Sequence, residues 1–427
     1  MVIMTSLAAL SNFDLSVLFF LQMAVILATC RAVGVVAKWV GQPPVVSEMI
    51  AGVVLGPSIF GAMFPEAQAW LFPAESRTVI YCVAQIGLAV YMFLIGVEFR
   101  GDLIAQRKQA AASVSIAGIA APFALGAGLA AFMHHDARMF AEGVGAWEAV
   151  LYLGAAMSIT AFPMLARIIH ERGLGGTSLG TLALAAGSID DAAAWCVLAV
   201  VLASFQSDAM IAAKAIGGGV LYAVLCLLVL RRMLRPLGTS VERSGTMSLA
   251  MLAFVLTMVM VGSWATDAMG IYAVFGAFIL GAAMPRGKFA SELNRMLYPA
   301  VTTLLLPLFF VNSGLNTKIG LIDSWSLAGI AAAIILAATV GKGVACFAAA
   351  KVHREPTRDA VALGALMNAR GLMELIILNI GYERGLITQT LFSIMVLMAI
   401  VTTLMATPIF EWALWRGRRQ DSPKLAQ

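Results

Sequence analysis

The chain has 427 residues, of which 61% are hydrophobic and only 12% are charged, and its formal net charge is +5. A typical soluble protein carries about 25% charged residues, so this composition excludes a soluble globular protein and indicates a polytopic membrane protein. The small net charge also argues against a nucleic-acid-binding protein. The five cysteines stand singly and form no CxxC, and no ATP-binding motif or catalytic triad occurs. We therefore expect a protein that is not an enzyme and has no resident cofactor.

Spanning the hydrocarbon core of a bilayer takes about 20 mostly apolar residues. Polar and Pro/Gly-rich breaks divide the chain into thirteen such stretches, with only Asp267 and Gly270 separating the eighth from the ninth. They cover residues 15–36, 43–62, 77–98, 108–133, 147–169, 177–205, 210–231, 246–266, 270–285, 296–315, 325–350, 358–382 and 388–415. The sequence therefore predicts an all-α polytopic membrane protein with about 13 transmembrane helices.

The basic residues orient these predicted spans. With the N-terminus outside, 21 Lys and Arg residues fall in cytoplasmic loops and 5 in outer loops, while Lys342 and Arg370 fall within spans. Cytoplasmic loops of membrane proteins are enriched in Lys and Arg. The asymmetry therefore supports thirteen spans and a short cytoplasmic tail at residues 416–427. No Lys or Arg precedes the first apolar run, so we do not expect a cleaved signal peptide.

A few ionisable residues lie within the predicted spans. A charge at mid-bilayer costs about 2.5–3.5 kcal/mol, which makes such residues candidates for function. They are Glu48 in the second span, Asp190 and Asp191 in the sixth, Lys342 in the eleventh, and Arg370 and Glu374 in the twelfth.

The adjacent Asp190 and Asp191 point about 100° apart on a helix, so only one can face a given cavity squarely. Ser188 lies three residues before Asp191 and shares its face. A carboxylate that binds a monovalent cation must first lose its proton, so one site can hold either a cation or a proton, as exchange requires. The alternative is that the two aspartates only join helices through hydrogen bonds, which a single Asn or Ser would do at lower cost.

Three further charged residues need partners in the membrane. Lys342 should pair with Asp190 or Asp191, because apart from Glu374 no other acidic residue lies deep in a span. Arg370 and Glu374 are four residues apart on one helix face and can neutralise each other. We expect this second pair to have a structural or gating role.

Two predicted spans contain breaks at mid-depth. The fifth contains Ser158, Thr160 and Pro163, and proline removes a backbone donor; the twelfth contains Asn368 and Gly371. Broken helices in corresponding positions of two halves point to the binding site of a transporter. Spans 1–6 and 8–13 would be the two halves. We therefore expect oxygens of Ser158 and Thr160 to contribute to an ion site.

One further motif predicts close helix packing. Gly52 and Gly56 form a GxxxG pattern in the second span, and such small residues let two backbones approach closely.

Several stretches resemble the monovalent cation:proton antiporters of the second cation:proton antiporter family, and most closely its plant and fungal exchangers and their bacterial relatives. They occur in order over nearly the whole chain: QPPVVSE (42–48), GVVLGPS (52–58), FLIGVE (93–98), SITAFPMLAR (158–167), IDDAAAW (189–195), PLFFVNSGL (307–315) and NARGLMEL (368–375).

The resemblance implies an NhaA-like inverted-repeat fold with two broken, crossed helices. Residues 108–205 and 325–415 would form an ion-binding core domain, residues 15–98 and 246–315 a dimerisation scaffold, and residues 210–231 a linker helix. In such proteins the residue matching Asp191 binds the ion, and the lysine matching Lys342 pairs with the residue matching Asp190. The chain departs from many plant relatives, which have Asn-Asp at this position and a long cytosolic domain.

We therefore expect a homodimer in the lipid bilayer of a bacterial inner membrane that exchanges Na⁺ or K⁺ for protons by alternating access. Asp191 would be the main ligand, and Asp190 a second carboxylate or the partner of Lys342. Two alternatives stay open. A proton- or sodium-coupled organic anion carrier would need an uncompensated basic residue in its cavity. A channel-like K⁺ efflux protein would conduct without proton coupling, and the sequence shows no selectivity-filter repeat.

Overall fold

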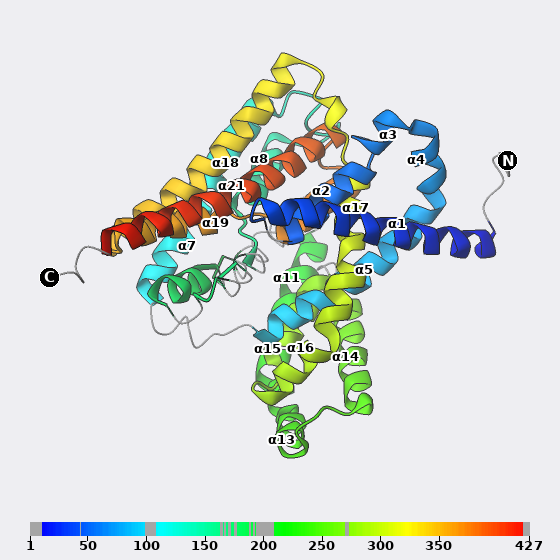
Figure 1. Cartoon of the computed structure of the whole chain (residues 1–427), viewed down its shortest axis with the longest axis vertical. Helices are drawn as coiled ribbons and strands as arrows, with labels where there is room; N and C mark the ends of the chain where they lie inside the picture. The colour runs from blue at the N-terminus through cyan, green and yellow to red at the C-terminus, as the bar shows by residue number, and fades with distance from the viewer. Residues whose placement is uncertain are drawn as a thin grey trace.

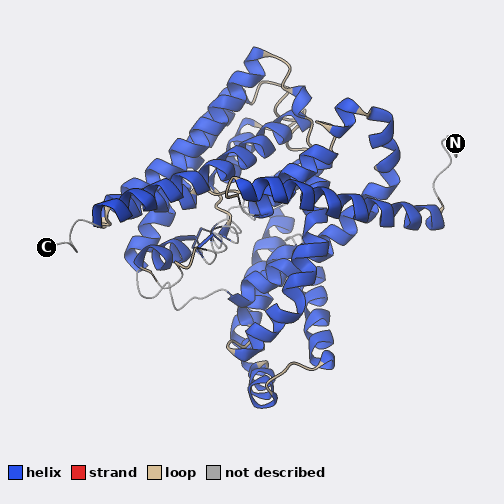
Figure 2. Ribbon diagram, in the orientation of Figure 1, coloured by secondary structure: helices blue, strands red, loops and turns tan. Residues whose placement is uncertain are grey.

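Helices make up almost all of the computed structural model (Figures 1 and 2). The structure describes residues 11–42, 44–98, 108–162, 209–269 and 273–421, together with residues 165, 168–169, 172–174, 177–187, 189–190 and 193. Within these ranges no strand forms, and one isolated antiparallel bridge joins Phe140 to Ile387.

The α-helices follow one another along the chain with short connections. They are α1 (Asn12–Trp39), α2 (Pro44–Leu55), α3 (Phe60–Met63), α4 (Pro65–Leu71), α5 (Ala74–Glu98), α7 (Lys108–Met133), α8 (Ala146–Ser158), α11 (Ala209–Val224), α12 (Arg231–Met233), α13 (Arg235–Ser244), α14 (Leu249–Ala268), α15 (Ala273–Ala283), α16 (Lys288–Ala300), α17 (Leu306–Leu315), α18 (Trp325–Val352), α19 (Thr357–Met367), α20 (Leu372–Glu383) and α21 (Gln389–Asp421), with π-helical turns at Leu225–Leu230 and Val301–Leu305 and a 3₁₀ turn at Ile319–Leu321.

Side-chain caps fix the start of several long helices. Ser11 and Ser324 accept hydrogen bonds from the backbone amides of Asp14 and Leu327, at the first turns of α1 and α18. Ser248 does the same for Met251 at the start of α14. Such caps satisfy amides that have no partner inside the helix.

Eight helical segments of the described chain are long and apolar enough to cross a membrane, and a ninth is added if the bent pair Gly217–Met233 and Arg235–Ser244 is one span. This confirms an all-α polytopic membrane protein. Several predicted spans are shorter: breaks divide the fifth and twelfth, and the ninth corresponds to the eleven-residue α15. Most of the sixth lies outside the described residues. The count of thirteen stays a prediction.

The helices pack in two groups (Figure 1). Helices α1, α2, α5, α14, α15 and α17 contact one another and form what we call the α5 group. Helices α7, α8, α18, α19, α20 and α21 form the α18 group. Contacts of α2 with α21 and of α17 with α20 join the two groups.

Glycines bring α2 and α17 together inside the α5 group. A Cβ atom added at Gly52 or Gly56 would overlap the backbone carbonyl of Phe310 or Gly314, and one added at Gly314 would overlap the backbone of Gly52. The predicted GxxxG face is therefore a backbone-to-backbone contact with no side chain between the helices. The same kind of contact joins α5 to α15 at Gly96 and Gly281.

Candidate ion-binding site

Two helices of the α18 group end in the middle of the structure, and their extended continuations meet there. Helix α8 ends at Ser158, after which Ile159 has extended backbone angles. Helix α19 ends at Met367, and α20 begins at Leu372. The amide of Ala161 donates to the carbonyl of Ala369 at 3.2 Å. Both predicted breaks are therefore present.

The break in the fifth span begins before the predicted position. Pro163 lies outside the described residues, whereas α8 already ends at Ser158.

Two buried cations bind the carbonyl groups that the end of α8 leaves free. The guanidinium of Arg370 donates to the carbonyls of Ala156, at 3.3 Å, and Met157, at 2.6 Å. The ammonium of Lys342 donates to the carbonyl of Ser158. The last carbonyls of a helix have no intrahelical partner and carry partial negative charge. Arg370 and Lys342 thus satisfy and neutralise the C-terminal end of α8.

The backbone of the second break is held by α21. The hydroxyl of Thr403 donates to the carbonyl of Arg370 at 2.6 Å, and the amide of Arg370 donates back to that hydroxyl at 3.1 Å.

Asp190 lies at the centre of this site and is 1% exposed. Its Oδ2 atom pairs with Nζ of Lys342 at 3.1 Å and accepts a hydrogen bond from the hydroxyl of Thr160 at 2.6 Å. Its Oδ1 atom accepts a hydrogen bond from the hydroxyl of Ser115 at 2.5 Å. A buried ion pair is stable only when hydrogen bonds satisfy its remaining lone pairs, and these donors do so. The predicted pairing of Lys342 with an aspartate is present, and its partner is Asp190.

Arg370 and Glu374 form a second buried pair, with Nη1 of Arg370 and Oε2 of Glu374 3.0 Å apart. The predicted neutralisation of these two residues is therefore present. The Oε1 atom of Glu374 and the Oδ1 atom of Asn368 are buried and accept no hydrogen bond from any described residue. These two oxygens have the capacity to accept a further donor or a cation.

The other predicted ligands differ in what the structure says of them. Thr160 lies at Asp190, and its hydroxyl also donates to the carbonyl of Met367 at 3.2 Å. Ser158 contributes its backbone carbonyl, because its hydroxyl donates back to Ala155 at 2.8 Å. Asp191 and Ser188 lie outside the described residues.

The sequence did not single out Ser115, although it binds Asp190. Ser113, two residues earlier on α7, has the same chemistry but bonds to the ring of His353 at 2.8 Å. No local signal distinguishes the two serines.

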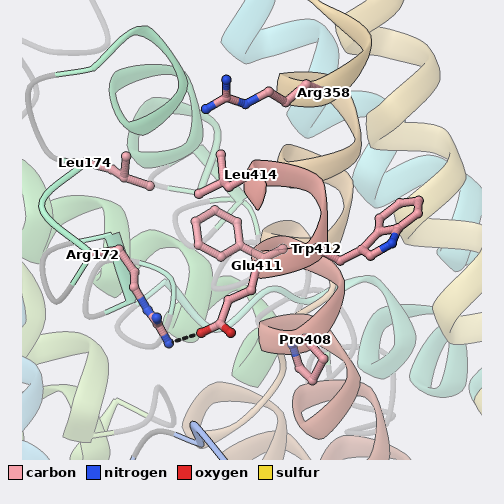
Figure 3. A pocket seen from close by; sticks show the side chains of 8 residues that line it. Arg172, Leu174, Arg358, Pro408, Glu411, Trp412 and Leu414 are labelled. Atoms are coloured by element: carbon pink, nitrogen blue, oxygen red, sulfur yellow. Dashed lines mark ion pairs between the residues drawn. The ribbon is translucent and has the colours of Figure 1, made fainter. Parts of the chain in front are cut away.

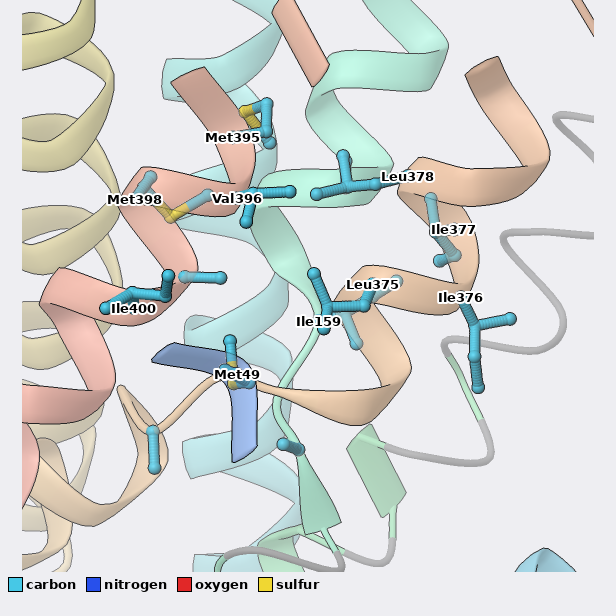
Figure 4. Close-up of a cluster of buried hydrophobic side chains, with 14 of the residues drawn as sticks. Met49, Ile159, Leu375, Ile376, Ile377, Leu378, Met395, Val396, Met398 and Ile400 are labelled. Atoms are coloured by element: carbon cyan, nitrogen blue, oxygen red, sulfur yellow. The ribbon is translucent and has the colours of Figure 1, made fainter. Parts of the chain in front are cut away.

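Apolar side chains surround the crossing of the two broken helices. Figure 4 shows Ile159 among side chains of α20 and α21, with Met49 of α2 nearby. All of these side chains belong to one buried cluster. Excluding water strengthens every electrostatic interaction inside, which is why the charged groups need close partners.

A cavity of about 710 Å³ lies away from Asp190, Lys342 and Thr160. Its lining includes an ion pair between Arg172 and Glu411 (Figure 3). The complete lining is Arg172, Leu174, Arg358, Pro408, Phe410, Glu411, Trp412 and Leu414. The described residues contain no group of three or more His, Cys, Asp or Glu side chains that could hold a metal ion.

Broken helices that cross around a buried charge pair, in a helical membrane protein, define a membrane transporter. The family model described as "Sodium/hydrogen exchanger, transmembrane" matches residues 24–416, and the chain belongs to this family. It is thus a transporter of monovalent cations and protons and not an enzyme. The resemblance seen in the sequence is confirmed.

Several characterised relatives are similar to the chain. It is 36% identical to the Na⁺/H⁺ antiporter NhaS4 of Synechocystis sp., over 92% of this chain and 96% of that protein. It is 35% identical to cation/H⁺ antiporter 20 of Arabidopsis thaliana, over 96% of this chain and 50% of that protein. It is 30% identical to K⁺/H⁺ antiporter 1 of Saccharomyces cerevisiae, over 92% of this chain and 46% of that protein. The chain therefore spans about half the length of the plant and yeast relatives.

The Arg370–Glu374 pair is expected to stabilise the fold. Replacing Arg370 with Ala leaves a buried carboxylate and two helix carbonyls without a donor, and should lower the free energy of unfolding by about 3–5 kcal/mol. The measurement is denaturant or thermal unfolding of the purified protein in detergent.

A matched control is Arg295→Ala, which removes an ion pair with Glu292 whose arginine side chain is 65% exposed. This change should cost less than about 1 kcal/mol. Equal losses in the two variants would contradict a structural role for Arg370.

Proposed function

We propose that the chain exchanges Na⁺ or K⁺ for protons across the membrane by alternating access. The observation that carries the proposal is the Asp190–Lys342 pair at the crossing of two broken helices, next to a second aspartate in the sequence. The names of the bacterial and yeast relatives, which exchange Na⁺ or K⁺ for protons, support the same class of substrate.

The two adjacent aspartates divide the work. Asp190 accepts from Ser115, Thr160 and Lys342, so its two oxygens are already occupied. Asp191 then supplies the carboxylate that binds either the cation or a proton, with Ser188 on the same helix face. These two assignments rest on the sequence.

A cation at Asp191 needs further oxygen ligands, because hard cations prefer oxygen donors. The buried Oδ1 atom of Asn368 and Oε1 atom of Glu374 are free to accept in the described part of the chain. The hydroxyl oxygen of Thr160 retains a lone pair beside Asp190.

The α18 group would be the moving core domain and the α5 group the scaffold of a homodimer. Three hydrogen bonds join them where α17 meets α20 and α21: the amide of Asn379 donates to the hydroxyl of Ser313 at 3.3 Å, Gln389 donates to the carbonyl of Asn316 at 3.1 Å, and the amide of Lys318 donates to the hydroxyl of Ser393 at 2.8 Å. Alternating access would require these bonds to break once in each cycle.

The two rival functions are less well supported. An organic anion carrier needs an uncompensated basic residue at its site, whereas Lys342 and Arg370 both face buried carboxylates. A channel would not need a titratable carboxylate at its ion site. Proton coupling separates the channel from the exchanger.

Replacing Asp191 with Asn should abolish exchange without changing the fold, because it removes the cation's charge partner and the proton site at almost constant volume. The measurement is the internal pH of proteoliposomes when Na⁺ or K⁺ is added outside. The control is Asp267→Asn on α14, an exposed position in the α5 group. A cation-induced pH change in Asp191→Asn liposomes would remove this residue from the site.

Cation affinity should weaken as the pH falls, because protons and cations compete for one carboxylate. Below the pKa of that carboxylate, each pH unit should raise the apparent half-saturation concentration about tenfold if one proton competes. The measurement is the initial exchange rate against cation concentration at several values between about pH 6 and 9. Half-saturation that stays constant over this range would indicate separate sites and favour the channel.

A disulfide between α17 and α20 should stop transport. With the five native cysteines replaced, Ser313→Cys combined with Asn379→Cys places two thiols where the native side chains are hydrogen-bonded. Oxidation should abolish exchange and reduction should restore it, whereas each single variant should ignore the oxidant. Full activity of the cross-linked protein would exclude movement between these two helices.

A further inference from the structure

We infer that Ser115 is a positioning residue that keeps the Asp190 carboxylate on Lys342 and out of the coordination shell of the transported cation. The inference rests on the proposed exchange at Asp191 and gives a role to a residue that contacts neither the cation nor Lys342. It follows from how the two oxygens of one carboxylate are shared among their donors.

The donors on Asp190 are unequally distributed. Oδ2 accepts from both Thr160 and Lys342, whereas Oδ1 accepts its hydrogen bond from Ser115. A carboxylate held at one oxygen can still turn about its Cβ–Cγ bond. A donor at each oxygen prevents that rotation, so Ser115 fixes the plane of the Asp190 carboxylate.

The position of Ser115 suits this task. It lies on α7, is fully buried, and reaches a residue 75 positions away in the chain. Helix α7 packs against α8, which leads into Thr160, and against α18, which carries Lys342. The hydroxyl is therefore anchored to both elements that supply the other two donors.

The chemistry of a helical serine supports a specific role. Such a hydroxyl commonly bonds back to a carbonyl of its own helix, as Ser158 does with Ala155. Ser115 donates to a charged carboxylate instead, and hydrogen bonds to charged groups are worth about twice as much as neutral ones.

Releasing Oδ1 would have a defined consequence. The carboxylate could turn towards the neighbouring Asp191 and compete with it, and Lys342 would lose part of its fixed partner. The transport cycle would slow because the charge pair must be re-formed in each turnover, while the ligands that bind the cation would stay in place.

The test is exchange in proteoliposomes by Ser115→Ala, Ser115→Thr and Ser115→Cys. Ser115→Ala should lower the maximal rate about tenfold, the scale of a lost hydrogen bond to a charged group, while the cation half-saturation concentration changes less than about twofold. Ser115→Thr should recover most of the rate, because it keeps the hydroxyl. Ser115→Cys, a weak donor of similar size, should lie between Ala and wild type and serves if the threonine variant does not fold.

Ser113→Ala is the matched control, since it removes a hydroxyl from the same helix that bonds to His353 rather than to Asp190. Its kinetics should equal those of the wild type. A wild-type rate in Ser115→Ala would overturn the inference, as would a rise in half-saturation as large as the fall in rate, which would make Ser115 a cation ligand. A threonine variant that folds but is as slow as alanine would also overturn it, because volume alone would then matter. Absence of cation-driven proton movement in the wild type would instead reject the proposed function itself.

Discussion

The ion pair between Asp190 and Lys342 is the constraint on which the rest of the site depends. Two charges buried at 0–1% exposure are tolerable only if close partners surround both. Those partners come from α7, from the end of α8 and from the extended segment that follows it. The fold must therefore hold three parts of the chain, distant in sequence, within hydrogen-bonding distance of one carboxylate and one ammonium.

The broken helices and the buried cations explain each other. Ending α8 inside the protein leaves carbonyls without partners, which is costly in an apolar interior. Arg370 and Lys342 provide the missing donors, and their own charges are balanced by Glu374 and Asp190. Each cation thus joins a helix end to a carboxylate, and the polar backbone at the crossing is stabilised together with the charges.

Much of this arrangement could be predicted from the sequence, because it follows from local spacing and from the cost of charge in a membrane. The four-residue spacing of Arg370 and Glu374 indicated their contact, and the shortage of deep acids indicated a partner for Lys342. The role of Ser115 could not be predicted, since only tertiary packing separates it from Ser113. Nor could the capping of α8 by Arg370, which joins residues more than 200 positions apart.

The glycine contact between α2 and α17 has a mechanical consequence. Where side chains interdigitate, two helices can slide slightly as rotamers change, so the contact is compliant. At Gly52 and Gly314 backbone touches backbone, and no rotamer is available to absorb a displacement. This contact therefore behaves as a stiff strut. A force applied to α17 where it meets Asn379 is passed on to α2 rather than dissipated, and the α5 group responds as a single body.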